Sequence, residues 1–419
     1  MKKACSLLAF VCAACGVGVA GPSGNQEELL GSNSEALCTV TPQELMITNL
    51  SVVEDPVRTV WTGSQTGVKD GAWTFGRLMT QMAGANDPSD FTLALFKHWE
   101  VTQVVNSFTV PARPNIDQVV LNPWPRLANG KLDLTKAPLR LLAIVDRFDL
   151  RKLSKGNAGE GRFVFGVLDS RGNPLSFTVI LEYKLPAATK ADVQAWADAW
   201  HALSTVPFPS AKYNNALQAI TDRFAGANAD PTKPNGSSIS QIRTNEIALS
   251  APWQLREFHL ETDGQLHEAT TANAPDESFN GQSTLAAFIN ANEATLLAGK
   301  GTIPLNFRNA PFRAGALNNS IDFWSAPGIN NNDARFQLSV NTCNGCHGRE
   351  TNTGFLQVGT RSRGVAAQLS GFLTGESVND PVSGVARSFA DLNRRAADLA
   401  SFVCPGGTQL TDSASERVE

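Results

Sequence analysis

The stretch FVFGVLDSRGNPLSFTVIL, residues 163–181, decides the fold class of this chain. Its two arms, 163–168 and 175–181, are rich in Leu, Ile, Val and Phe, as buried strands are. Between them lies DSRGNP, a cluster of residues that favour tight turns. The pattern predicts a β-hairpin in an antiparallel sheet, and the apolar run LRLLAIV at 139–145 predicts a further strand.

The segments around this hairpin predict helices and more strands. Thr189 followed by Asp192 matches the capping box that begins a helix. Apolar residues recur at helical spacing between 213 and 224, and strand-like patterns return at 239–249 and 253–267. Further helices are predicted at 73–82, 91–99 and 285–297. The larger part of the chain is therefore expected to be α+β, with helices and an antiparallel sheet mixed along the sequence.

Composition limits the partners of the protein. The 419 residues include 35 Lys+Arg and 39 Asp+Glu, a net charge of −4, and 42% of them are hydrophobic. This is the composition of a globular protein, with enough chain for two or three domains. No long basic run is present, so we expect no nucleic acid as a main partner, because binding of phosphate requires clustered Lys and Arg.

The N-terminus resembles a bacterial export signal. Lys2 and Lys3 precede a short run of small and apolar residues, too short to span a membrane. One interpretation is cleavage after Ala20, which releases a soluble protein. The favoured one is a lipoprotein signal over residues 1–15, in which Cys15 is lipidated and residues 16–37 form a flexible tether. The expected location is the periplasm or cell envelope, with a lipid anchor to the membrane.

A loop rich in Gly, Asn and Asp at 328–333 is the expected boundary between two domains. It separates an α+β domain at 38–330 from a small helical domain at 334–404, and a disordered tail is expected at 405–419. Helices are predicted at 334–342, 363–374 and 385–403.

The second domain contains Cys343, Asn344, Gly345, Cys346 and His347, which form a C-x-x-C-H motif. This is the attachment signature of c-type haem. On one helical turn, the two thiols reach the two vinyl groups at one edge of a porphyrin, and the histidine that follows turns under the ring to bind iron.

On this motif and the helices around it, residues 334–404 resemble a small c-type cytochrome domain. The resemblance implies one covalent haem c, held through Cys343 and Cys346, with His347 as the proximal iron ligand. The segment departs from the family in one respect: no Met, His or Lys follows His347 to serve as the second axial ligand. The sixth position is then open, or its ligand comes from the larger domain. The candidates for that ligand are His98, His201, His259, His267, Met79 and Met82.

Other interpretations of the cysteines stay open. Cys343 and Cys346 can form a structural disulfide, bind zinc with His347 and a remote residue, or act as a redox-active thiol pair. If they carry haem and Cys15 carries lipid, Cys38 and Cys404 are left in the body of the protein, and an exported protein can pair them as a disulfide.

The function predicted from these features is electron transfer or haem-based redox chemistry at the envelope, with a redox protein or a small oxidant as partner. The alternative is a non-haem envelope lipoprotein with a binding or structural role, in which the cysteines form disulfides. Charged residues within the apolar strands fit either a substrate-binding cluster or salt bridges on strand faces. They are Arg162, Arg243, Arg256, Glu160, Glu246 and Glu257.

Overall fold

The computed structural model describes residues 38–63, 70–321 and 323–404. The chain from Cys38 onward forms one compact unit. The expected leader at 1–15, the tether at 16–37 and the tail at 405–419 lie outside the described residues, and so do Cys15 and the alternative cleavage site after Ala20. Within the described part of the chain, no helix has the length and apolar character needed to cross a bilayer.

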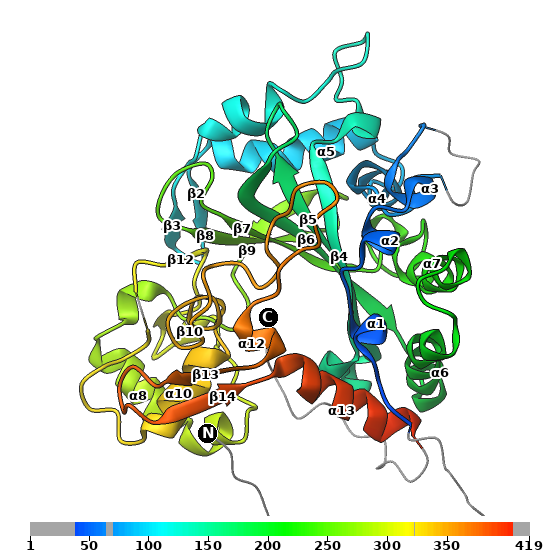
Figure 1. Ribbon diagram of the computed structural model, residues 1–419. Helices are drawn as coiled ribbons and strands as arrows, with labels where there is room; N and C mark the ends of the chain where they lie inside the picture. The colour runs from blue at the N-terminus through cyan, green and yellow to red at the C-terminus, as the bar shows by residue number, and fades with distance from the viewer. Residues whose placement is uncertain (1–37, 64–69, 322, 405–419) are drawn as a thin grey trace, which may run out of the picture. The chain divides into compact units, whose positions relative to one another are not determined.

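An antiparallel sheet of eight strands organises this unit (Figure 1), and its main path runs β1-β4-β5-β6-β7-β8-β12, with β9 also paired to β8. The strands are β1 (Met46–Ile47), β4 (Leu139–Arg147), β5 (Asn157–Leu168), β6 (Pro174–Pro186), β7 (Ile239–Glu246), β8 (Gln254–Leu260), β9 (Leu266–Ala269) and β12 (Leu317–Asn318). The hairpin predicted at 163–181 is confirmed as the β5–β6 pair, in which Phe163 lies opposite Leu181. The α+β class expected from the sequence is also confirmed.

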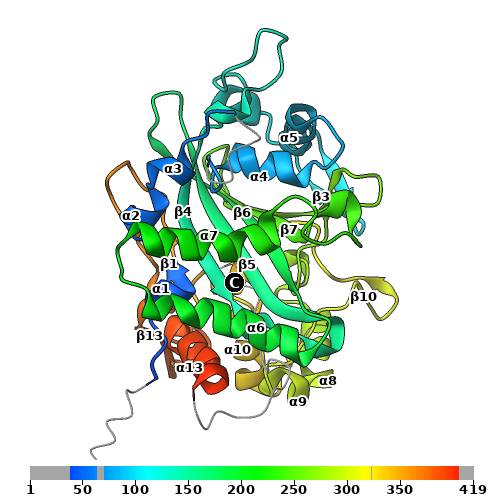
Figure 2. The same cartoon turned by 90° about the vertical axis from the view of Figure 1, so that its right-hand side faces the viewer.

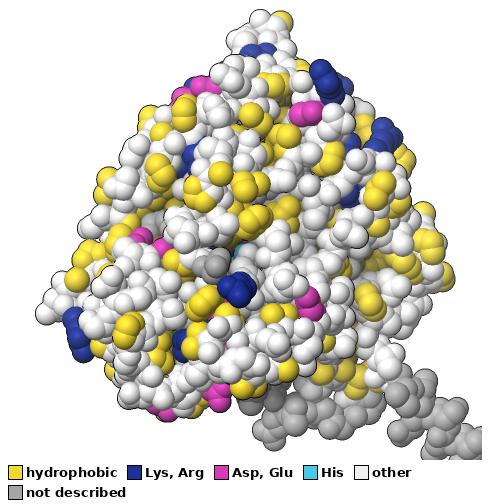
Figure 3. All heavy atoms as spheres, turned by 60° about the vertical axis from the view of Figure 1, so that its left-hand side comes forward, with side chains coloured by type: hydrophobic (Ala, Val, Ile, Leu, Met, Phe, Trp, Pro, Cys, Tyr) yellow, Lys and Arg dark blue, Asp and Glu magenta, His cyan; other side chains and the backbone are white. Residues whose placement is uncertain are grey.

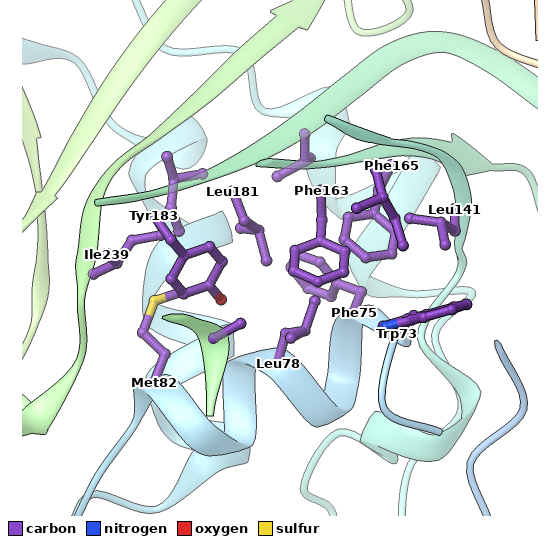
Figure 4. Packing of buried hydrophobic residues seen from close by; sticks show 14 of the residues in the cluster. Trp73, Phe75, Leu78, Met82, Leu141, Phe163, Phe165, Leu181, Tyr183 and Ile239 are labelled. Carbon is purple, nitrogen blue, oxygen red and sulfur yellow. The ribbon is translucent and has the colours of Figure 1, made fainter. Parts of the chain in front are cut away.

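Helices cover one face of the sheet (Figure 2). They include α4 (Phe75–Met82), α5 (Pro88–Lys97), α6 (Lys190–His201) and α7 (Ala211–Ala225). The Thr189 hydroxyl accepts a hydrogen bond from the Asp192 amide, so the predicted capping box does begin α6. Figure 4 shows side chains of α4 meeting alternate residues of the strands, such as Phe163 and Phe165 of β5.

The C-terminal segment covers part of the opposite face of the sheet. It contains α10 (Asn332–Val340), α11 (Cys343–Cys346), α12 (Gly371–Thr374), β13 (Glu376–Asn379), β14 (Ala386–Phe389) and α13 (Asp391–Val403). Leu142 and Val164 pack here against Phe336 and Leu373. Both faces of the central strands are therefore buried. This explains why the sequences of these strands are nearly continuous apolar runs.

The other α-helices and strands lie before or between these elements along the chain. They are α1 (Pro42–Leu45), α2 (Leu50–Val53), α3 (Pro56–Thr59), β2 (Gln103–Val105), β3 (Phe108–Val110), α8 (Ser283–Ala291), α9 (Glu293–Leu297), β10 (Asn306–Phe307) and β11 (Ala310–Pro311).

The C-terminal segment differs from the helical arrangement predicted for it. The helix predicted at 385–403 begins only at Asp391, because residues 386–389 pair with β13 and Ala390 has an extended φ of −165°. The helix predicted at 363–374 is reduced to α12, since residues 363–370 form a turn and irregular chain, and Val358 bridges Leu369. Arg361 holds this segment on the sheet by donating to the Leu141 carbonyl of β4 at 2.9 Å.

Candidate functional site

The C-x-x-C-H motif lies on α11, directly after α10. The Thr342 hydroxyl caps α11 by accepting from the Gly345 amide at 3.2 Å. Gly345 has no space for a side chain, because a Cβ there would lie 2.0 Å from the carbonyl oxygen of Ser339. The glycine inside the motif therefore allows α11 to lie against the end of α10.

Two buried contacts fix Asn344, which lies between the cysteines. Its amide oxygen accepts from the Trp324 indole at 3.2 Å, and its amide nitrogen donates to Glu277 at 3.2 Å. Trp324 and Glu277 come from the segment before α10. The motif is thus held from both sides by groups far from it in sequence.

His347 is buried, with 6% of its surface exposed. Its Nδ1 donates to the Phe355 carbonyl at 2.5 Å, and its ring stacks on Trp253 at 5.5 Å. Burial lowers the pKa of His347 to about 4, although the Phe355 carbonyl acts in the opposite direction. The imidazole is therefore neutral at pH 7, with its proton on Nδ1. In the part of the chain described, nothing hydrogen-bonds to Nε2, whose lone pair is available for a ligand bond.

Cys343 and Cys346 are both buried and both carry thiols. Burial raises the pKa of the Cys343 thiol to about 11. A redox-active thiol pair requires a lowered pKa and access to solvent, so this environment does not favour that interpretation. The Cys346 sulfur accepts a hydrogen bond from Gln357 at 3.2 Å and packs in the apolar cluster that contains Val164 and Val358.

A narrow slot lies beside His347, between the sheet and the C-terminal segment. Its empty volume is about 510 Å³, but the centre of a water molecule can occupy only about 50 Å³ of it. Figure 3 shows a hollow in this side of the molecule with a histidine side chain and apolar side chains in it. The slot is lined by Met46, Val145, Arg147, Arg162, Val164, Thr178, Ile180, Asn245, His347, Leu356, Gln357, Val358, Leu373 and Arg395.

Two polar side chains of the sheet line the slot, and one of them has an unpaired atom. Asn245 donates to the Thr178 hydroxyl at 3.3 Å, and each residue is 2% exposed. The Asn245 amide oxygen has no partner among the described residues. An unpaired buried polar atom costs roughly 1–3 kcal/mol, so this oxygen marks a place where a polar ligand or water is expected.

The charged residues within the strands form ion pairs on both faces of the sheet. On the slot side, Arg243 pairs with Glu257 at 2.9 Å and Glu182 at 3.2 Å. Arg162 on the same side pairs with Glu160 at 2.7 Å. On the helix side, Glu246 pairs with Arg113 at 2.7 Å and Arg256 with Glu268 at 3.4 Å. The cluster considered from the sequence is therefore two sets of buried salt bridges separated by the sheet.

The structure brings none of the remote ligand candidates into the slot. Met79 and Met82 pack on the helix side of the sheet. His98 contacts the Leu266 carbonyl and His201 contacts Glu44. His259 and His267 lie opposite each other on β8 and β9, and they contact Glu257 and Asp263 respectively.

Sequence reasoning missed several residues of the slot. Met46, Arg147, Asn245 and Arg395 line it together with His347, although they come from four separate elements. Only Arg147 carried a local signal, a charge at the end of an apolar strand. A disulfide joins Cys38 and Cys404, the pair expected from the sequence if the motif cysteines are used elsewhere.

Comparison with known proteins finds no match: no family model, no curated protein and no solved structure is similar to this chain.

The resemblance of residues 334–404 to a small c-type cytochrome is therefore wrong. No family model supports it, and the segment contains a two-stranded sheet and packs on the central sheet. Across the residues described, no group of three or more His, Cys, Asp or Glu side chains is placed to hold a metal ion. The zinc interpretation, which requires such a group at Cys343, Cys346 and His347, gains no support from the described residues.

Proposed function

We propose that this protein is a redox protein of the bacterial cell envelope that carries one covalent haem on Cys343 and Cys346. The His347 Nε2 atom is the proposed iron ligand. The protein exchanges electrons with a redox partner or reacts with a small oxidant. This proposal does not depend on a cytochrome fold, because haem attachment requires only the motif, one ligand and an apolar space.

The single observation that carries the proposal is the state of His347. Ligating histidines commonly donate one ring N–H to a carbonyl, which orients the ring and leaves the other nitrogen for the metal. His347 has this arrangement through Phe355, and it borders an apolar slot. A buried histidine with a purely structural role would be expected to use both nitrogens.

The motif residues supply the groups that would attach a haem, but the slot beside them does not have room for one. Cys343 and Cys346 would hold the group through thioether bonds, each thiol adding its sulfur and its hydrogen across one vinyl group, so attachment would need no oxidant. The hydrogen bond from Gln357 to Cys346 is lost in this step. A bound haem would therefore require the chain at 354–370 to lie farther from the sheet than it does in this structure. The bound haem would supply a one-electron redox centre.

Location at the envelope rests on the export signal in the sequence. A lipid on Cys15, followed by the tether at 16–37, would anchor the protein to the membrane surface. Export also agrees with the Cys38–Cys404 disulfide, because disulfides persist in oxidising compartments.

The test is an alkaline pyridine haemochrome spectrum with haem staining in a denaturing gel, on protein exported from a host that attaches haem c. We expect one covalent haem per chain, and none in Cys343→Ala/Cys346→Ala. The matched control is Cys38→Ser/Cys404→Ser, which removes two cysteines elsewhere and should keep the haem. Folded, colourless wild-type protein would contradict the proposal and favour the non-haem lipoprotein.

A further inference from the structure

We propose that the Cys38–Cys404 disulfide is a thiol–disulfide exchange site whose substrate is a protein dithiol. His201 contacts the sulfur of Cys38 and gives a proton to it when the bond opens, and Glu44 positions His201. This inference goes beyond the proposed haem function and does not depend on it, because it uses neither the C-x-x-C-H motif nor the slot.

The first support is a row of side chains that leads to the disulfide. The His201 Nε2 atom lies 3.6 Å from the Cys38 sulfur. On the other side of the ring, Nδ1 lies 2.7 Å from a carboxylate oxygen of Glu44. These groups come from the neighbouring helices α1 and α6 and from the chain just before α1 (Figure 2). An imidazole that contacts a cysteine sulfur and is oriented by a third group is the arrangement that activates reactive cysteines.

The second support is the fixed position of Glu44. This side chain is fully buried, and its Oε1 atom accepts from the amide and the hydroxyl of Thr41 at 2.7 and 2.8 Å. Its Oε2 atom is left for the bond to His201. Because a carboxylate only accepts hydrogen bonds, Nδ1 of His201 carries the proton of this bond. Nε2 therefore faces the sulfur, as a base in the neutral ring and as an acid in the charged ring.

The third support is access to the bond. Cys38 and Cys404 are both half-buried, and the His201 side chain is 23% exposed. Exchange requires a thiolate to reach one of the two sulfurs, which a fully buried disulfide prevents. The partly exposed Cys38–Cys404 bond therefore differs from the buried thiols of Cys343 and Cys346.

The surroundings of the two sulfurs indicate which one leaves. The Cys38 sulfur lies beside the imidazole, which can supply a proton to it. The Cys404 sulfur lies 3.3 Å from the Cys38 carbonyl oxygen, which can accept a bond from an S–H group but disfavours a thiolate. Exchange is faster when the departing sulfur is the better leaving group. The partner is therefore expected to attack Cys404 and release Cys38.

The reaction balances in two steps. A thiolate of the partner dithiol attacks the Cys404 sulfur, the S–S bond breaks, and the Cys38 sulfur leaves with the electron pair and takes the proton from His201. The second thiolate of the partner then attacks the partner's own sulfur in the mixed disulfide and releases Cys404. Two electrons pass from the dithiol, which becomes a disulfide. Its two protons go to solvent, which returns one to His201 and one to Cys404.

The experiment measures the rate at which dithiothreitol, as the probe dithiol, opens the disulfide in the folded, exported protein. Alkylation followed by peptide mass spectrometry quantifies the Cys38–Cys404 peptide. We expect reduction without denaturant, and reduction about a hundredfold slower in His201→Gln, because a positioned acid is lost. A purely structural contact predicts the opposite direction, since loosening would expose the disulfide. His267→Gln is the matched control, because His267 pairs with Asp263 on the surface, and it should match the wild type.

A second measurement tests whether Glu44 acts through His201. In Cys404→Ser and Cys38→Ser, one of the two sulfurs remains as a thiol, and peptide mass spectrometry follows its alkylation by iodoacetamide. We expect Cys38 to react about tenfold faster than Cys404, since a cysteine beside an imidazole has a larger thiolate fraction. Adding Glu44→Gln should lower the rate of Cys38 and leave that of Cys404 unchanged. A structural role of Glu44 would change both rates.

A wild-type disulfide that dithiothreitol opens only under denaturing conditions would overturn the inference. A folded His201→Gln variant that is reduced as fast as the wild type, or faster, would do the same. Equal alkylation rates of Cys38 and Cys404 would also overturn it, and this comparison decides the matter even if His201→Gln does not fold. These assays do not involve haem, so a haemochrome spectrum without haem would remove the proposed function and leave this inference in place.

Discussion

At the residue scale, the slot side of the sheet depends on charges that are buried together. Arg243 lies between Glu182 and Glu257, with contacts of 3.2 and 2.9 Å. Burial raises the pKa of Glu257, but the charges of Arg243 and His259 offset this, and the pKa is lowered to about 2. The folded state therefore favours the carboxylate form of Glu257, and these ion pairs stabilise the sheet.

The pH dependence follows from that lowered pKa. An acid whose pKa is lower in the folded state stabilises the protein above its unfolded pKa, here 4.5, and this stabilisation is lost as pH falls toward 2. We expect about 3 kcal/mol of unfolding free energy to be lost across this range. Glu257→Gln should cost about 3 kcal/mol at pH 7, because Arg243 loses a buried partner.

Urea unfolding at pH 7, 5 and 3 measures the pH dependence and the effect of the substitution. The difference in unfolding free energy between the wild type and Glu257→Gln should become smaller as pH falls. Asp263→Asn is the control, since Asp263 pairs with His267 on the surface, where its side chain is 55% exposed. It should change stability little. If the difference in unfolding free energy between the wild type and Glu257→Gln stays constant with pH, Glu257 is not charged in the folded state.

At the scale of elements, α13 is joined to the start of the described chain. The Cys38–Cys404 disulfide links residues 366 positions apart, one just before α1 and the other directly after α13. Asp398 of α13 also forms an ion pair with Arg151, which follows β4. Since Arg395 of α13 lines the slot, the disulfide supports one wall of the candidate site from a distance.

Removal of this disulfide should loosen α13 before the rest of the protein. Cys38→Ser/Cys404→Ser is expected to lower the free energy of unfolding by about 2–4 kcal/mol, since the unfolded chain gains freedom. Hydrogen exchange measured by mass spectrometry should increase most in α1 and α13. A reducing agent should reproduce the effect in the wild type and leave the variant unchanged. Equal exchange in α13 with and without the disulfide would contradict this role.

At the scale of the whole molecule, the domain boundary expected near residue 330 does not separate two cores. Residues before it and residues after it pack into the same hydrophobic cluster. Phe336 and Leu373 of the C-terminal segment pack against Leu142 and Val164 of the sheet. Cys343 packs in another cluster with Trp253 and Leu255. The chain from Cys38 onward is one compact unit by its contacts, which favours a single folding unit.

A chain that ends at residue 330 should therefore aggregate, because the apolar sheet face that includes Leu142 and Val164 would be exposed. The complete protein should unfold in a single transition. Calorimetry and tryptophan fluorescence would measure it, and the two transitions should coincide. A soluble 38–330 chain with a cooperative transition of its own would instead establish two domains.

The sequence by itself determined the local features of this protein: the β5–β6 hairpin, the capped start of α6, the α+β class and the C-x-x-C-H motif. Each of these depends on residues close together in the chain, where turn propensity, periodicity and capping act. The extent of α13 was not predictable in this way, because pairing of β14 with β13 overrides the helical pattern of residues 386–389.

Only the tertiary structure decided what surrounds the motif. The bond from His347 to Phe355 is local, but the stack on Trp253, the slot and the unpaired Asn245 oxygen depend on strands β7 and β8 lying under the C-terminal segment. The exclusion of Met79, Met82 and the other histidines from the slot has the same origin. No local pattern encodes these contacts, because they arise when two distant segments bury the two faces of one sheet.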